Sequence, residues 1–145
     1  MKSIQKKIVA FLTAVLLMVV PTHLDAAVID PGNQVMPCWV YMHTVTIGLN
    51  FNGTKGYADI TVAPLNGITT YLEATLNVYR RTGGDWTLIA SSSNSSTSTL
   101  CVDVEFNAVS GQTYKAEAII TAHGANGSET DTVSRQDNCP KAEDS

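Results

Sequence analysis

Charged, aromatic and sulfur-containing residues are scarce in this chain. Of its 145 residues, 15% are charged, 7% are aromatic and 3 are cysteine, and the formal net charge is −4. A mildly acidic chain without basic clusters argues against nucleic acids and anionic membrane surfaces as partners. The same composition fits solubility outside the cell.

Motifs of catalysis and metal binding are also missing. The sequence has no Gly-x-Ser-x-Gly elbow and no Cys-x-x-Cys pair, so we predict no catalytic residue, no metal ligand and no cofactor. His43 and His123 would share one end of an up-and-down sandwich, which keeps a small secreted hydrolase open as an alternative. Asp103 and Glu105 on one strand face are expected to be solvated. Residues 128–131 are acidic but lack the turn glycine of an EF-hand loop.

Only one long hydrophobic run is present, and it lies near the start. Three lysines within residues 2–7 precede an apolar run over residues 8–20, which has the length of a signal-peptide core and is too short for an ordinary membrane span. We predict a signal peptide over residues 1–26, with an uncleaved anchor as the alternative. Cleavage after Ala26 would leave 119 residues with 6 basic and 12 acidic side chains. We therefore expect a secreted, extracellular protein with no membrane span after cleavage.

The rest of the chain alternates apolar and polar residues with the period of β-strands. Residues 91–98 are rich in serine and are predicted to form a loop. In the fourth segment, Trp86, Leu88 and Ala90 are expected to face inward. No stretch has helical periodicity, and the connections are too short for crossover helices. The seven segments are Thr44–Phe51, Tyr57–Ala63, Thr69–Arg81, Trp86–Ala90, Leu100–Phe106, Tyr114–Ala122 and Ser128–Arg135.

This pattern predicts an all-β protein, a seven-stranded antiparallel two-sheet sandwich. A closed barrel is the alternative. The predicted domain covers residues 44–135, after an N-terminal lead over residues 27–43 and before a polar tail over residues 136–145.

One stretch carries a resemblance to known sandwiches. The sequence Gly-Gln-Thr-Tyr-Lys-Ala-Glu-Ala over residues 111–118 resembles the tyrosine corner of immunoglobulin-like and fibronectin type III-like domains, with Tyr114 as the structural corner residue. Ala116 stands where antibody domains have a cysteine. Together with residues 44–47 and 83–86, the stretch is also similar to small, mostly uncharacterised secreted proteins of Gram-positive bacteria. The resemblance implies a scaffold, and such scaffolds host unrelated functions.

The three cysteines, Cys38, Cys101 and Cys139, predict one disulfide and one spare thiol in an exported protein. Cys38 and Cys101 would lie at one end of the sandwich and Cys139 at the other, roughly 20 to 30 Å away. A disulfide needs Cα atoms within about 7 Å, which favours Cys38–Cys101. Cys38–Cys139 stays open because both flanks are long enough to fold back. The spare thiol would allow a covalently assembled structural subunit.

The few aromatic residues offer a possible binding face. Tyr71 and Tyr79 are expected on the outward side of one strand, and Trp39 and Tyr41 share a side just before the first strand. Aromatic rows stack on sugar rings or anchor protein partners, although Trp39 and Tyr41 could equally cover the end of the core. We therefore expect a non-catalytic module that binds a glycan or a protein at the cell surface or in the medium.

Overall fold

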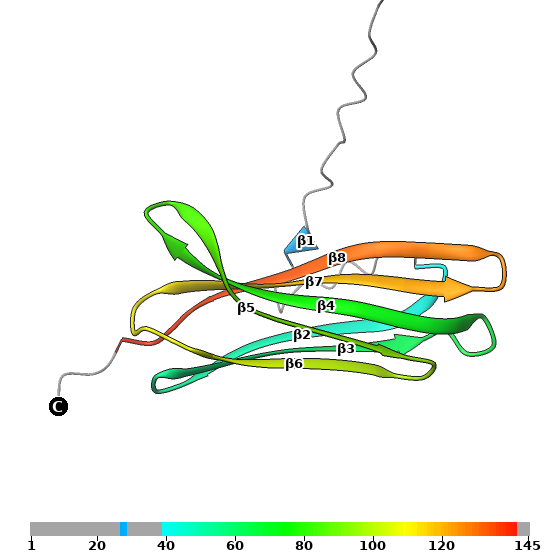
Figure 1. Cartoon of the computed structure of the whole chain (residues 1–145), viewed down its shortest axis with the longest axis horizontal. Helices are drawn as coiled ribbons and strands as arrows, with labels where there is room; N and C mark the ends of the chain where they lie inside the picture. The colour runs from blue at the N-terminus through cyan, green and yellow to red at the C-terminus, as the bar shows by residue number, and fades with distance from the viewer. Residues whose placement is uncertain (1–26, 29–38, 142–145) are drawn as a thin grey trace, which may run out of the picture.

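Eight strands and no helix make up the described part of the computed structural model, residues 27–28 and 39–141 (Figure 1). The predicted signal peptide and Cys38 lie outside the described residues. The described part contains no helix that could span a membrane. The strands are β1 (Ala27–Val28), β2 (Met42–Asn52), β3 (Lys55–Pro64), β4 (Thr69–Thr82), β5 (Asp85–Ser96), β6 (Leu100–Asn107), β7 (Thr113–Gly124) and β8 (Gly127–Asn138).

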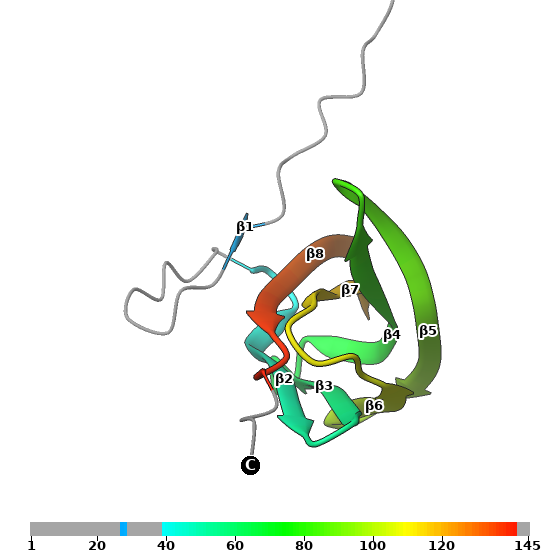
Figure 2. The ribbon, with the colours of Figure 1, turned by 90° about the vertical axis from the view of Figure 1, so that its left-hand side faces the viewer.

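The strands form two sheets that lie one above the other (Figures 1 and 2). One sheet has the order β1-β8-β7-β4-β5 and the other has the order β2-β3-β6. The seven long strands pair antiparallel, and only the two-residue β1 pairs in parallel, with β8. The predicted seven-stranded antiparallel two-sheet sandwich is confirmed, and the closed-barrel alternative is wrong.

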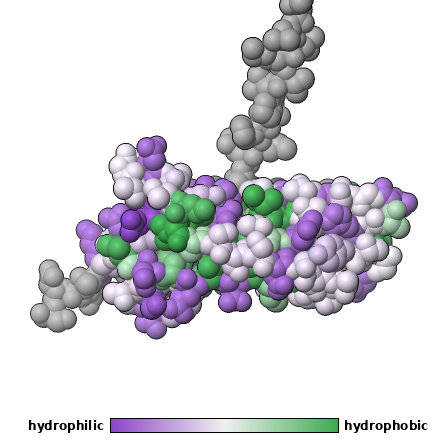
Figure 3. All heavy atoms as spheres, in the orientation of Figure 1, coloured by the Kyte–Doolittle hydropathy of each residue, from purple (hydrophilic) through white to green (hydrophobic). Residues whose placement is uncertain are grey.

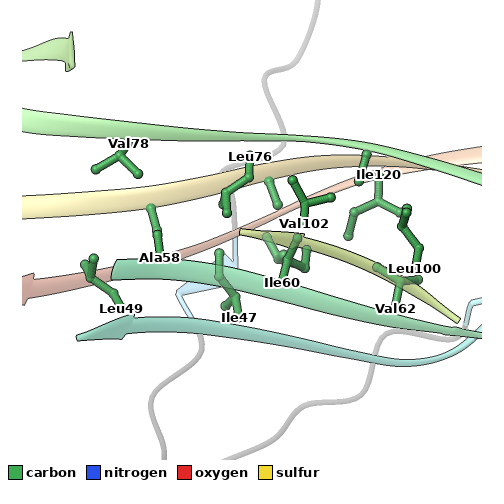
Figure 4. Packing of buried hydrophobic residues seen from close by; sticks show 14 of the residues in the cluster. Ile47, Leu49, Ala58, Ile60, Val62, Leu76, Val78, Leu100, Val102 and Ile120 are labelled. Atoms are coloured by element: carbon green, nitrogen blue, oxygen red, sulfur yellow. The ribbon is translucent and has the colours of Figure 1, made fainter. Parts of the chain in front are cut away.

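The core lies between the sheets because every second residue of the central strands points inward. Leu76, Val78 and Ile120 from one sheet face Ile47 and Ile60 from the other (Figure 4). All five are at most 5% exposed. The odd-even hydrophobic pattern of the sequence thus places these side chains where two stacked sheets bury them.

Side chains close both seams between the sheets. At one seam, the Asn94 side-chain amide on β5 donates a hydrogen bond to the Cys101 carbonyl on β6, at 3.0 Å. At the other seam, Glu129 on β8 accepts hydrogen bonds from three successive backbone N–H groups, those of residues 40–42 at the start of β2. Figure 2 shows β5 beside β6 and β8 above β2 at these two places.

The prediction for the serine-rich segment is wrong, since β5 continues through Ser96. Residues 91–96 pair with residues 72–77 of β4, so hydrogen bonding to β4 overrides the low strand propensity of serine. The inward prediction is also wrong for Trp86 and Leu88, because they pair with Arg81 and Tyr79 on the outer face of β4, and Leu88 is 53% exposed. Val78 pairs with Ala90 and Tyr79 with Leu88, so Ile89 is an extra residue in a β-bulge that reverses the alternation.

The strands extend past the predicted domain bounds at both ends. β2 begins at Met42, inside the predicted lead, and β8 ends at Asn138, inside the predicted tail. Cys139 follows and is buried, and its backbone exchanges hydrogen bonds with Gly111 and Gln112.

Candidate functional site

A groove lies on the outer face of the β4, β5 and β7 strands and has a volume of about 390 Å³. The groove is open to solvent and is not an enclosed cavity. The side chains that line it are those of Tyr71, Glu73 and Thr75 on β4, Ser93 and Ser95 on β5, and Ile119 and Thr121 on β7, with Ala74 and Asn94 below them. Strand pairing explains this gathering, because Thr75 lies opposite both Ser93 and Ile119.

One end of the groove is formed by the Tyr71 ring and the Glu73 carboxylate, and the His123 imidazole lies beside both. Tyr71 is 38% exposed, and its ring lies 5.7 Å from the His123 ring between centroids. His123 Nε2 lies 3.0 Å from Glu73 Oε1. β4 and β7 bring these residues together, since Tyr71 pairs directly with His123. The partly exposed Tyr71 ring thus lies beside a carboxylate that is hydrogen-bonded to an imidazole.

The floor of the groove and the adjoining part of β4 and β5 are rich in hydroxyl and amide groups. Thr75 and Ser93 hydroxyls lie 2.9 Å apart, and Ser91 donates to the Asn77 side-chain oxygen at 2.7 Å. These bonds hold the side chains in fixed positions while leaving lone pairs and protons for a ligand.

A second aromatic cluster lies farther along the same face. Lys115 Nζ sits 4.7 Å from the Tyr79 ring centroid and 5.4 Å from that of Trp86. The same ammonium group lies 2.8 Å from Glu117 Oε2. The cluster lies where the β-bulge in β4 and β5 bends their hairpin away from the sandwich (Figure 1).

Trp39 and Tyr41 belong neither to the lining of the groove nor to the cluster of Tyr79, Trp86 and Lys115. Both pack against the core. Trp39 Nε1 donates to Asp131 Oδ2 at 2.6 Å, and the Tyr41 ring lies so close to Gly124 that a Cβ there would overlap it. Of the two placements considered from the sequence, a binding face or a cover over the end of the core, Trp39 and Tyr41 therefore adopt the second.

The acidic residues 128–131 hold the chain in place. Glu129 binds the backbone of residues 40–42, and Asp131 binds Trp39. Sequence reasoning missed this role because the partners are nearly ninety positions apart in the chain. The only available signal was an acidic pair in a β-strand with no basic neighbour.

The two carboxylates considered for a hydrolase lie on the opposite sheet. Asp103 and Glu105 are exposed on β6, and Glu105 forms an ion pair with Lys55 at 2.6 Å. The hydrogen bond and negative charge of Glu105 raise the pKa of Lys55. Among the described residues, no three His, Cys, Asp or Glu side chains form a metal-binding group.

The described histidines do not contact one another. His43 is exposed on β2, whereas His123 is bonded to Glu73 on the other sheet. The structure therefore provides no hydrogen-bonded pair of His43 and His123.

The two described cysteines, Cys101 and Cys139, are free thiols. Cys101 is exposed beside Thr61, and the Cys139 thiol lies near the Gly53 carbonyl at the other end of β3. About 20 Å of strand separates the two positions, which excludes a bond between them in this fold. Pairing through Cys38 stays a prediction.

Tyr114 is fully buried on β7, and its ring packs against Phe51 and Phe106 at centroid distances of 5.4 and 5.3 Å. Its hydroxyl accepts a hydrogen bond from the Val109 backbone N–H at 2.8 Å. Tyr114 thus fixes the connection between β6 and β7.

The chain matches no protein-family model, and no curated protein is detectably similar to it.

Proposed function

We propose that the protein is an exported, non-catalytic β-sandwich module that binds a glycan in the outer-face groove. The observation that carries this proposal is the exposed Tyr71 ring beside a rigid row of hydroxyl groups. A sugar ring has an apolar face that stacks on an aromatic ring, and its hydroxyls exchange hydrogen bonds with serine, threonine and carboxylate groups. The groove offers both an aromatic ring and hydrogen-bonding groups on three adjacent strands, β7, β4 and β5.

The charges of the groove favour binding over hydrolysis. Glycoside hydrolysis generally uses two carboxyl groups on either side of the scissile bond. The groove is lined by one carboxylate, that of Glu73, and His123 occupies it. Asp103 and Glu105 lie on the other sheet.

Export and family relationship belong to the same proposal. The leader over residues 1–26 supports secretion. The hydrogen bond from Val109 N–H to the Tyr114 hydroxyl, which reaches back five residues, supports the resemblance to immunoglobulin-like and fibronectin type III-like sandwiches. Neither a nucleic acid nor a membrane is part of the proposed function.

A glycan array and a cell-wall pull-down test the proposal. The wild-type chain without its leader is compared with Tyr71→Ala and with Tyr57→Ala, a matched control because Tyr57 is 42% exposed on the opposite sheet. We expect glycan binding by the wild type and the control, and a loss of about tenfold with Tyr71→Ala, as for an aromatic contact of about 1.4 kcal/mol. Absence of glycan binding by the wild type, or equal binding by all three, would refute the proposal.

A covalently assembled structural subunit is a second candidate, favoured by the exposed Cys101 thiol on β6. It requires the alternative Cys38–Cys139 pairing, which leaves Cys101 as the spare thiol. A non-reducing gel of the secreted protein separates the two. A dimer band that is present for the wild type and absent for Cys101→Ser would support covalent assembly. A monomer band for both proteins would exclude covalent assembly and leave the glycan-binding module as the remaining proposal.

A further inference from the structure

We infer that the ligand is an extended, uncharged polysaccharide that runs along β4 from Tyr71 to the cluster of Tyr79, Trp86 and Lys115. This inference rests on the proposed function and specifies the class of glycan. It differs from a short oligosaccharide held in the groove alone, because it requires contacts at both ends of the outer face.

The spacing along β4 sets the length of the track. Residues 71, 73, 75, 77 and 79 all project from the outer face, since the residues between them are buried in the core. Tyr71 and Tyr79 are eight residues apart, or about 26 Å at the rise of a β-strand. A mono- or disaccharide in the groove cannot reach both rings. A linear polymer lying parallel to β4 can.

The surface between the two ends suits hydrogen bonding to an uncharged chain. Hydroxyl and amide side chains of β4, β5 and β7 alternate there and are already held by one another. The bonded pairs are Thr75 with Ser93, Asn77 with Ser91, and Thr121 of β7 with Thr130 of β8. Ile119, which is 42% exposed, adds an apolar contact midway.

Charges of both signs lie along this track. Lys115 pairs with Glu117, Glu73 is hydrogen-bonded to His123 at the groove end, and the exposed Arg81 lies opposite Trp86 at the far end. The track has no cluster of one sign that would attract a polyanion or a polycation, which favours a ligand without carboxylate, sulfate or phosphate groups.

The bent β4–β5 hairpin borders the end of the track at the cluster of Tyr79, Trp86 and Lys115. Lys115 Nζ lies over the rings of Tyr79 and Trp86 and holds both in place. Leu88, 53% exposed, follows Trp86 on the same strand face. Figure 3 shows hydrophobic residues gathered beside the base of this hairpin. Residues of intermediate hydropathy continue along the same side of the molecule. An additional sugar ring can contact this cluster.

Affinity electrophoresis in gels that contain a polymer tests the inference. The probes are two uncharged polymers, a soluble β-glucan and glycol chitin, and two acidic ones, polygalacturonate and hyaluronan. Titrations with the corresponding neutral oligosaccharides of two to eight units follow. The proteins are the wild type, Tyr71→Ala, Trp86→Ala and the control Tyr57→Ala.

We expect a neutral polymer to retard the wild type and the Tyr57 control, and the acidic polymers not to. Trp86→Ala should weaken binding of the polymer and of the longest oligosaccharides about tenfold, and leave the shortest ones unchanged. Tyr71→Ala should weaken binding at every length. Affinity that stops rising beyond two or three units, or that is unaffected by Trp86→Ala, would overturn the extended track while leaving the groove proposal intact.

Three other outcomes would also overturn the inference. Retardation by the acidic polymers alone would contradict the uncharged ligand. Binding of short glycans on the array without retardation by either neutral polymer would restrict the site to the groove. A dimer in sedimentation that Trp86→Ala dissociates would mean that a second copy of the chain covers this face.

Discussion

Replacing Glu129 tests how the start of β2 is held to the rest of the sandwich. The Glu129 carboxylate accepts hydrogen bonds from the backbone N–H groups of Tyr41 and Met42 through Oε1, at 2.6 and 3.1 Å. Its other oxygen accepts from the Val40 N–H at 2.9 Å. Glu129→Ala removes all three acceptors at once, and no ladder hydrogen bond replaces them, because β2 pairs only with β3.

The magnitude follows from which of the three donors water can reach. The Val40 bond is exposed, so water replaces it at little cost, whereas the Tyr41 and Met42 bonds are partly buried. An unsatisfied buried donor costs about 1 to 3 kcal/mol. Because these two are only partly buried, we expect Glu129→Ala to lower the free energy of unfolding by about 2 to 3 kcal/mol. For a domain of this size, that corresponds to a melting temperature lower by roughly 10 °C.

Glu129→Gln separates charge from hydrogen bonding. A glutamine oxygen in the position of Oε1 still accepts hydrogen bonds from the Tyr41 and Met42 N–H groups. The glutamine NH₂ group then faces the Val40 N–H, and because both groups are donors, that hydrogen bond is lost. We therefore expect a smaller loss, about 1 kcal/mol.

Urea unfolding followed by tryptophan fluorescence and by far-ultraviolet circular dichroism measures these differences at constant m-value. The control is Glu105→Ala, which removes an exposed acid whose ion pair with Lys55 lies on the surface and should lower stability far less than Glu129→Ala does. The order of stability should be wild type, Glu129→Gln, then Glu129→Ala. A Glu129→Ala variant as stable as Glu105→Ala would refute the reasoning.

Two further substitutions test the core and the opposite sheet. Tyr114→Phe keeps the packed ring but leaves a backbone N–H without its hydroxyl acceptor, so the unfolding free energy should fall by about 1 kcal/mol; an unchanged urea midpoint would contradict this role of the hydroxyl. Asp103 lies directly opposite Asp59 on the outer face, and like charges in that position are destabilising. Asp103→Asn should therefore raise the unfolding free energy by a few tenths of a kcal/mol, about 0.2 to 1, with a smaller gain at 1 M salt; a loss of stability at low salt would count against repulsion.

Much of the fold could be predicted from the sequence because alternation and turn residues are local signals. The run over residues 72–78 places its apolar members inward, as observed for Leu72, Leu76 and Val78. The serine-rich part of β5 could not be predicted, because its pairing with β4 is a contact with another segment and leaves no apolar pattern. Leu88 was misplaced because an inserted residue in a bulge reverses the alternation without changing composition.

The candidate site was predictable only in part. Tyr71 and Tyr79 could be placed on an outward face from β4 alone. The neighbours that make a groove around Tyr71 come from strand order, since β7 lies beside β4 and supplies Ile119 and Thr121. The contacts of Glu129 and Asp131 with residues 39–42 likewise join distant parts of the chain.

The serine-rich composition of β5 has a consequence for how the protein behaves at high concentration. β5 is the last strand of its sheet, where an apolar strand with free backbone groups would recruit other chains and seed fibrils. Its residues 91–96 carry only small polar side chains, and Asn94 ties this border to β6. Small polar side chains on this edge strand therefore make it a poor template for pairing with the strands of other chains.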